Sequence, residues 1–344
     1  MFDELRVLIL DNWNQWGLDR KPDDLSFIRR TSTWLGDKGK VIYYIFRRGD
    51  SWPCLIAKTV QSLQYGETIR QEAQNLFCVW ERVSGIIRQT LPRPIAITEI
   101  NRLPIYIEEA IPGIALPEKV MRCWNKRKRY HLLAESVSTT TEWLSNFITE
   151  LGVEHRKLSA DDVEHWFLNP LRQLAQEETL GPWERRLLAQ LEERVNSLVG
   201  RELPFVASHG DFWGGSLLWG TDKKMRVVDW EFFQPKSLPL FDLFMLAVHP
   251  GVALNSDGCN LVSEFSMCFE ENPHSKQVRH SLKKFSEQLG AQKDILELLF
   301  QFFLIRMSAQ RDQAQIKVGA KTRTTWAACF EYYLLHKEQF NILP

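Results

Sequence analysis

His209–Trp219 (HGDFWGGSLLW) and Val227–Glu231 (VVDWE) are the two stretches that decide the fold of this chain. The first places Asp211 at the start of a glycine-containing loop. The second places Asp229 at the end of an apolar, β-type run. Two carboxylates presented in this way suit phosphoryl transfer, in which one orients a hydroxyl group and the other holds a metal ion.

Composition and charge place the chain among ordinary globular proteins. Of its 344 residues, 44% are hydrophobic and 25% are charged, and the length suffices for one large domain or two lobes. Lys and Arg together number 43, as do Asp and Glu, so no overall field attracts nucleic acid or an anionic membrane. We therefore expect neither as a partner, whereas the oligomeric state stays open.

The cysteines and the N-terminal segment predict a cytoplasmic protein. The six cysteines include no C-x-x-C pair, which argues against a zinc site or a disulfide framework and favours reduced thiols. The first residues, MFDELRVLILDNWNQW, predict an acidic amphipathic helix without the basic start and small-residue cleavage site of a signal peptide. No apolar run approaches the roughly 20 residues that span a bilayer.

The first 110 residues alternate apolar and polar residues in the manner of a sheet. Turn residues and Asn101 separate runs that we expect to form two hairpins: Lys40–Arg47 with Trp52–Val60, and Ile95–Ile97 with Ile105–Ile107. Between the hairpins, Glu67–Arg82 has apolar residues at helical spacing. Residues 1–110 therefore predict a small antiparallel sheet with one packed helix.

Residues 111–344 are mostly helical in pattern, apart from a β-like insertion at Val206–Asp229 that carries the two opening stretches. Amphipathic helices are expected at Tyr130–Leu151, Asp161–Glu178, Pro182–Leu198, Asn260–Glu271, Ser275–Leu289, Lys293–Ala309 and Thr324–Gln339. The predicted fold class is α+β, with a small antiparallel-sheet N-lobe over residues 1–110 and a larger helical C-lobe over residues 111–344.

Lys58 lies in the second predicted strand, between apolar neighbours. A buried lysine without a partner costs several kcal/mol. Glu72, fourteen residues later in the predicted helix, could form an ion pair that fixes the ammonium for contact with nucleotide phosphates. The alternative is a solvent-exposed lysine on an edge strand, and Lys58 taken alone favours that alternative.

Together these motifs resemble the aminoglycoside phosphotransferase and choline kinase family, which has a protein-kinase-like fold. The resemblance extends over most of the chain and rests on H-G-D-x-x-x-x-(N)-x-L followed by V-V-D-W-E. Lys58 matches the family's phosphate-binding lysine, and Glu72, in R-Q-E-A, matches its helix partner. Tyr106–Gly113 (YIEEAIPG) matches the hinge that ends the N-lobe, which implies that the backbone of Glu109 and Ile111 hydrogen-bonds adenine.

The resemblance further implies an ATP-dependent O-phosphotransferase that uses Mg²⁺, with GTP as an alternative donor, and acts on a hydroxyl group of a small molecule. Asp211 would be the catalytic residue that orients this hydroxyl, and Asp229 with Ser216 would hold the metal. Asp242, in Pro239–Leu243 (PLFDL), would be structural. The helices that follow would line the acceptor pocket, with contacts from Arg306, Arg311 and Trp326.

Two departures from the family pattern affect this interpretation. Thr31–Gly39 (TSTWLGDKG), where the family covers the nucleotide, shows no clear phosphate-cradling pattern. Ser216 stands where the family carries asparagine, and its oxygen is one bond closer to the backbone. A shortfall on the order of 1 Å must then be closed by water or by movement of Gly214–Gly215, because Mg²⁺ requires short ligand distances. We expect one well-held metal through Asp229 and a weaker second one.

Ser216 also motivates an alternative, a pseudokinase-like scaffold that binds a nucleotide or another ligand with weak or no catalysis. A third interpretation keeps the site but transfers phosphate from GTP or onto a protein side chain. A basic cluster at Arg122–Tyr130 could bind an anionic ligand, but its isolation in a charge-balanced chain favours the solvated start of a helix.

Overall fold

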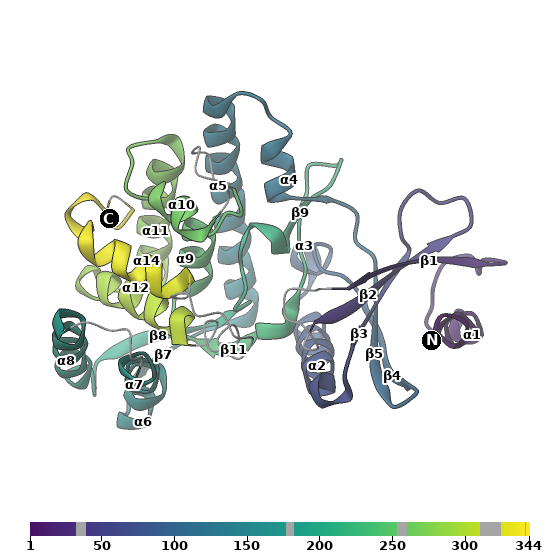
Figure 1. The fold of residues 1–344 in the computed structure, drawn as a ribbon, viewed down its shortest axis with the longest axis horizontal. Helices are drawn as coiled ribbons and strands as arrows, with labels where there is room; N and C mark the ends of the chain where they lie inside the picture. Colours follow the sequence, from purple (N-terminus) through teal and green to yellow (C-terminus); the bar gives the residue numbers. More distant parts are fainter. Residues whose placement is uncertain (32–38, 177–181, 253–259, 310–324, 341) are drawn as a thin grey trace. The chain divides into compact units, whose positions relative to one another are not determined.

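The computed structural model describes residues 1–344 except 32–38, 177–181, 253–259, 310–324 and 341. The chain forms two compact units (Figure 1). Unit 1 contains residues 1–114 and 218–233, and unit 2 contains residues 115–217 and 234–344. The predicted lobe boundary at residue 110 lies close to the end of the first segment of unit 1. The prediction did not associate residues 218–233 with the N-terminal sheet.

Unit 1 is built on a five-stranded antiparallel sheet in the order β1-β2-β3-β5-β4. Its strands are β1 (Leu25–Thr31), β2 (Lys40–Arg47), β3 (Leu55–Val60), β4 (Pro94–Ile100) and β5 (Leu103–Glu109). Both predicted hairpins form, and Asn101 and Arg102 turn the second one with positive φ values of 52° and 68°. β3 begins three residues later than predicted, after Pro53, which has no N–H to donate to the ladder. Strand β1 was not predicted.

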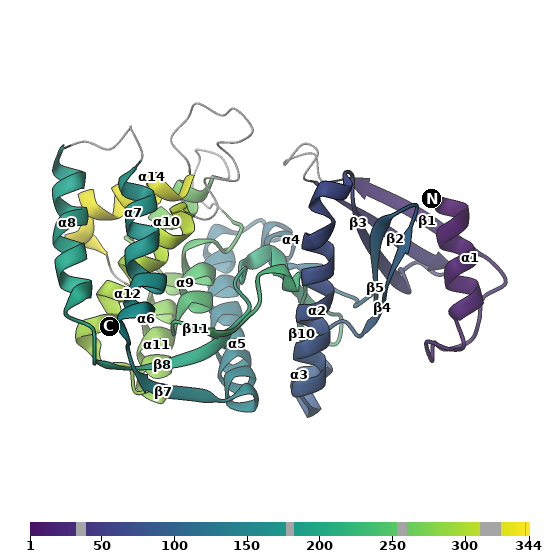
Figure 2. The same cartoon turned by 90° about the horizontal axis from the view of Figure 1, so that it is seen from below.

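The two faces of this sheet have different chemistry. Alternation along β2, β3 and β5 directs Val41, Ala57 and Ile107 to one face, where they pack with helix α1 (Phe2–Asn12). The opposite face receives Lys58 and its cross-strand partner Tyr106. Helix α2 (Gly66–Arg82) packs against β3, β4 and β5, and the figures show α1 and α2 on opposite sides of the sheet (Figures 1 and 2).

The remaining elements of unit 1 are short. Helix α3 (Gly85–Arg88) follows α2. Strands β6 (Ile114–Ala115), β9 (Leu217–Trp219) and β10 (Met225–Val227) form a small sheet in the order β10-β9-β6. After β10 the chain makes a 3₁₀ turn at Trp230–Phe232, which packs against α2. This contact brings the predicted metal-binding stretch into the same unit as the five-stranded sheet.

Unit 2 is mainly helical, as predicted. Its helices are α4 (Leu116–Met121), α5 (Lys126–Leu151), α6 (Ala160–Val163), α7 (Asn169–Ala175), α8 (Pro182–Asn196), α9 (Phe241–Val248), α10 (Leu261–Ser266), α11 (Pro273–Gln288), α12 (Lys293–Met307) and α14 (Thr325–Leu335). A three-stranded antiparallel sheet in the order β11-β8-β7 accompanies them. It consists of β7 (Val153–Lys157), β8 (Glu202–Ser208) and β11 (Gln234–Ser237).

Several predicted helices differ in detail from those observed. The helix predicted at Asp161–Glu178 is divided by a π-helical segment at Glu164–Leu168. The helix predicted at Asn260–Glu271 ends at Ser266, and Asn272 then caps α11 with a reciprocal hydrogen bond to Ser275. The basic cluster lies at the start of α5, where Asn125 caps the helix and Trp124 is 98% exposed. None of the described helices is long and apolar enough to cross a bilayer.

An aromatic cluster forms much of the core of unit 2. Phe300, on α12, is completely buried, and its ring lies 5.1 Å from Phe244, 5.4 Å from Tyr333 and 4.7 Å from Phe340. Helix α11 packs along α5, and both helices contact α9. Such interiors are close-packed, so truncation of a central ring leaves a cavity that neighbours fill only in part.

Phe300→Ala should therefore lower the free energy of unfolding by about 3–5 kcal/mol. Leu335→Ala is the control because Leu335 lies on α14 in the same unit and is 64% exposed, so that its truncation should cost about 0.5 kcal/mol or less. Urea unfolding followed by fluorescence measures both. Equal midpoints for the two variants would contradict this description of the core.

Candidate active site

The centre of unit 1 is the ammonium group of Lys58, which is almost fully buried in the middle strand of the sheet. Its Nζ atom lies 2.6 Å from Oε1 of Glu72, 2.9 Å from Oε1 of Glu108 and 3.3 Å from Oδ1 of Asp229. The ammonium group donates hydrogen bonds to Glu72 and Asp229 and forms a third ion pair with Glu108. The predicted pair with Glu72 forms, and Lys58 is not an exposed edge-strand residue.

Helix α2 positions Glu72 through its apolar face. Ile69, Ala73 and Leu76 recur at helical spacing and are buried. Glu72, buried on the same helix, also accepts a 2.6 Å hydrogen bond from Nζ of Lys40 on β2. Lys40 in turn lies 2.8 Å from Oε2 of Glu231, so the carboxylate of Glu72 is shared between two lysines.

Sequence reasoning missed Lys40, Glu108 and Glu231 as members of this network. The alternation of the strands was a usable signal for two of them, because Lys40 and Glu108 fall in the same phase as Lys58 once the register is known. No comparable signal exists for Glu231, whose contact with β2 depends on the return of residues 218–233 to unit 1.

Asp229 occupies a strained turn. Its φ of 66° lies in the left-handed region, which costs about 1–3 kcal/mol for a residue other than glycine and persists only where the surroundings hold it. Asn75 of α2 supplies part of that hold by donating to the carbonyl oxygens of Trp230, at 2.9 Å, and Glu231, at 3.1 Å. The Asp229 side chain is 44% exposed, so its carboxylate is fixed yet open to a ligand.

Burial and neighbouring charges shift the pKa values of the residues in this network. Burial alone would lower the pKa of Lys58, but Glu108, Glu72 and Asp229 raise it well above its usual value. Burial opposes ionisation of Glu72 as well, yet Lys40 and Lys58 lower its pKa to about 2. For Glu108, burial prevails and raises the pKa despite the contact with Lys58. Lys58 and Glu72 are therefore firmly charged, and Glu108 is the carboxylate most easily neutralised.

The predicted hinge begins within β5, whose last residue is Glu109, and continues through Gly113. The N–H of Glu109 donates to the carbonyl oxygen of Arg93 at 2.9 Å, and its side chain pairs with Arg93 at 2.6 Å. The N–H of Ala110 donates to the carbonyl oxygen of Cys54 at 3.0 Å. The N–H of Glu109 is therefore already hydrogen-bonded to Arg93. The predicted contact with adenine would then use the carbonyl oxygen of Glu109 and the backbone of Ile111.

In unit 2, Asp242 organises the loop that carries Asp211. Asp242 lies in the first turn of α9 and accepts hydrogen bonds from the Ser208 hydroxyl at 2.9 Å and from the N–H groups of His209 at 2.7 Å and Gly210 at 3.0 Å. Burial raises the pKa of its carboxyl group, and these donors oppose the rise. Asp242 is thus an internal anchor, as the sequence predicted for it.

Within the loop, Asp211 is held through its backbone. Its N–H donates to Nδ1 of the fully buried His209 at 3.3 Å, and its carbonyl oxygen accepts from the N–H of Trp213 at 3.0 Å. The same carbonyl oxygen accepts from the hydroxyl of Ser216 at 2.9 Å. Ser216 is completely buried, so its hydroxyl faces the backbone of the loop and would have to turn to meet a metal.

The two glycines before Ser216, which we expected to permit movement of the loop, are closely packed. A Cβ atom on Gly214 would overlap the carbonyl oxygen of Pro250, and one on Gly215 would overlap the ring of Trp213. The N–H of Gly214 also donates to the carbonyl oxygen of His249 at 3.2 Å. Trp213 and His249 stack with ring centres 4.7 Å apart.

Two of the predicted acceptor contacts, Arg306 and Trp326, are buried. The Arg306 guanidinium lies 4.5 Å from the ring centre of Trp166 and donates to Gln234 at 3.2 Å, and burial lowers its pKa to about 10. Trp326 is buried beside Phe303. Arg311 and most of Thr31–Gly39 lie outside the described residues.

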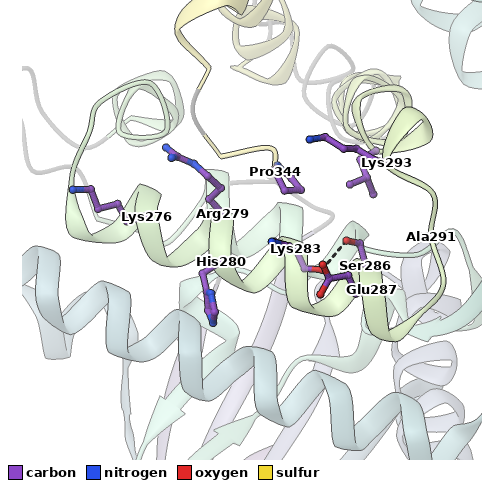
Figure 3. A pocket seen from close by; sticks show the side chains of 10 residues that line it. Lys276, Arg279, His280, Lys283, Ser286, Glu287, Ala291, Lys293 and Pro344 are labelled. Atoms are coloured by element: carbon purple, nitrogen blue, oxygen red, sulfur yellow. Dashed lines mark hydrogen bonds between the residues drawn. The ribbon is translucent and has the colours of Figure 1, made fainter.

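A groove of about 580 Å³ lies elsewhere in unit 2, between α11 and α12 (Figure 3). Its walls are mainly basic and include Lys276, Arg279, Lys283 and Lys293 with the single acid Glu287. Lys276 and Arg279 are already partly neutralised by Glu271, at 3.4 and 3.2 Å. None of the predicted site residues lines this groove.

Glu72→Gln should destabilise unit 1 by roughly 3–5 kcal/mol at pH 7, because it leaves two buried lysines without their shared charge. The pKa of Glu72 is lowered from 4.5 to about 2, so its contribution is complete above pH 4.5 and is lost as the pH falls toward 2. The difference from wild type should shrink over that interval in urea unfolding. Glu67→Gln, at an exposed position on the same helix, is the control. An equal effect of both changes at pH 7 would refute the assignment.

Comparisons with known proteins identify the family and the fold. A family model described as "Phosphotransferase enzyme family" matches residues 47–260, more than half of the chain. The fold resembles that of a thermostable mutant of aminoglycoside phosphotransferase APH(4)-Ia, with a TM-score of 0.58 at 12% identity over 91% of this chain and 95% of that one.

Two further structures of thermostable APH(4)-Ia mutants are also similar. One is a ternary complex with ADP and hygromycin B, with a TM-score of 0.57 at 12% identity over 96% of this chain and 97% of that one. The other contains AMP-PNP and hygromycin B, with a TM-score of 0.58 at 10% identity over 96% and 98%. No curated protein sequence matches the chain. The predicted fold class and resemblance are thereby confirmed. The chain belongs to the phosphotransferase enzyme family.

Proposed function

We propose that this protein is an ATP-dependent O-phosphotransferase that transfers the γ-phosphoryl group to a hydroxyl group of a small molecule. The observation that carries the proposal is the buried Lys58, bound to Glu72 and Asp229 in one network. A structural lysine needs no such arrangement with a half-exposed carboxylate. A lysine that must meet phosphate beside a metal-binding aspartate does.

Lys58 would bind the nucleotide phosphates by exchanging partners. Three carboxylates surround its ammonium group, and a phosphate oxygen would take the place of at least one of them. Asp229 is the longest contact and the most exposed of the three carboxylates, and Glu108 is the most easily neutralised. Glu72, with its pKa near 2, would remain in place and keep the ammonium oriented.

The residues present fit Mg²⁺. No group of three or more potential protein ligands gathers at one point among the described residues. Mg²⁺ is usually bound by one or two carboxylates with substrate phosphates and water, and Asp229 offers such a carboxylate. We propose Asp229 as its principal ligand and Ser216 as a weaker one. Bound there, Mg²⁺ would neutralise charge on the transferring phosphoryl group.

Asp211 is the proposed catalytic residue. A backbone held by His209 and Ser216 fixes the start of its side chain, which is what orientation of an acceptor hydroxyl requires. The hydroxyl would donate its proton to the Asp211 carboxylate and attack the γ-phosphorus in line as the bond to ADP breaks. No covalent enzyme intermediate is needed. The adenine would contact the backbone of Glu109 and Ile111.

The small-molecule acceptor follows from the family and from the ternary complexes of similar structures with hygromycin B. The zero net charge of this chain favours acceptors other than strong polycations. Competition between ATP and GTP for the purified protein, followed by mass analysis of the product, identifies the phosphate donor and separates small-molecule transfer from modification of a protein side chain.

A nucleotide-binding scaffold is the second candidate, because the hydroxyl of Ser216 is buried against the backbone of Asp211. This arrangement retains the shape of the loop without presenting a metal ligand. The scaffold predicts nucleotide binding without turnover, whereas the phosphotransferase predicts both.

Asp211→Asn should reduce ADP release by about 10²- to 10⁴-fold while nucleotide binding is retained, because it removes the proton acceptor but not the phosphate contacts. The assay uses Mg-ATP and a broad panel of alcohols, sugars and aminoglycosides. Asp161→Asn, at an exposed position in the same unit, is the control and should match wild type. If wild type with the full panel never releases ADP above background, the proposed activity is wrong.

Ser216→Asn should lower the Mg²⁺ concentration that supports half-maximal turnover, because an amide oxygen reaches one bond farther than a hydroxyl. The measurement is ADP release as a function of Mg²⁺ at fixed ATP. Absence of turnover in both forms, with nucleotide bound to both in calorimetry, would favour the scaffold instead.

A further inference from the structure

The second lysine of the network has no role in the proposed reaction. Lys40 begins β2, and its side chain is mostly buried. Its Nζ atom lies 2.6 Å from Glu72 and 2.8 Å from Glu231. These carboxylates come from α2 and from the turn that follows Asp229, so one ammonium group joins a helix to the predicted metal-binding turn.

We propose that Lys40 is a positioning residue that fixes the Asp229 turn to α2 by bridging Glu72 and Glu231. The inference rests on the proposed function for its catalytic consequence. Its structural part, the hold on the turn, depends only on the contacts within unit 1.

The turn needs such a bridge because Lys58 would give up a carboxylate contact when it binds phosphate. Binding of phosphate draws Lys58 away from at least one carboxylate, and its 3.3 Å contact with Asp229 is the longest. The Asp229 backbone, in its left-handed conformation, must then keep its shape without that contact. The contacts that would still hold the turn include those of Lys40 with Glu231, those of Asn75 with the carbonyl oxygens of Trp230 and Glu231, and the packing of the buried Trp230 against α2.

The charge of Lys40 is stabilised by the carboxylates around it. Burial alone would lower the pKa of Lys40, but Glu72, Glu231 and Asp229 raise it, so the lysine stays charged. Glu72 is buried and Glu231 is partly exposed, so the ammonium group of Lys40 connects a buried carboxylate of α2 with a partly exposed carboxylate of the turn. A neutral side chain at residue 40 would leave two like charges facing each other at this point.

The test compares Lys40→Met with wild type in two measurements. Hydrogen exchange of the ligand-free protein reports on the turn directly, and the amides of residues 230–232 should exchange at least tenfold faster in the variant. Calorimetry with AMP-PNP should show at least a tenfold weaker dependence of binding on Mg²⁺, with less than threefold change when Mg²⁺ is absent.

Three further variants separate positioning from charge and from misfolding. Lys40→Arg should restore both readouts, because it keeps two donors for two carboxylates. Lys40→Met combined with Glu231→Gln restores the net charge without the bridge and should remain defective. Glu231→Gln alone breaks the bridge from its more exposed side, and so serves if Lys40→Met does not fold. Arg30→Met, on the exposed part of neighbouring β1, is the matched control.

Unchanged exchange at residues 230–232 in both Lys40→Met and Glu231→Gln would overturn the inference, as would recovery in the charge-restored double variant. Failure of wild type to bind AMP-PNP at all would count against the proposed function instead. The exchange measurement would still decide whether Lys40 holds the turn.

Discussion

The ion pair between Lys58 and Glu72 is the contact on which unit 1 depends. A buried ammonium is tolerable only with close counter-charges, and three carboxylates surround this one. They come from α2, from β5 and from the turn after β10, three segments that are distant in sequence. The need to satisfy one charge therefore draws the helix, the sheet and residues 218–233 into a single unit.

Unit 2 also contains a buried charged group that is satisfied by residues of other segments, the carboxylate of Asp242. Asp242 is buried at the start of α9 and takes three donors from Ser208, His209 and Gly210 at the end of β8. The loop that follows cannot move independently of α9 without leaving that charge unsatisfied. Asp211 is thus presented by a loop whose entry is fixed electrostatically and whose exit is fixed by the contact of Gly214 with Pro250.

The sequence was sufficient for the features that depend on local pattern or on complete motifs. Strand β2 lies where alternation predicts it, and the Lys58–Glu72 pair follows from one strand and the next helix. Features that depend on contacts between distant segments could not be predicted. Glu231 gains its role only when its segment meets β2, and Gly214 only when its loop meets residue 250. The close packing of both glycines likewise became visible only when the neighbours of the loop were known.

Sharing Glu72 between two lysines also limits how this protein can be switched. Displacement of α2 away from the sheet would separate Glu72 from Lys40 and Lys58 together and break buried ion pairs. Loss of even one such pair costs about 3–5 kcal/mol, which holds the displaced state to fewer than about one molecule in a hundred. A regulatory mechanism that depends on a movement of this helix would have to overcome that cost.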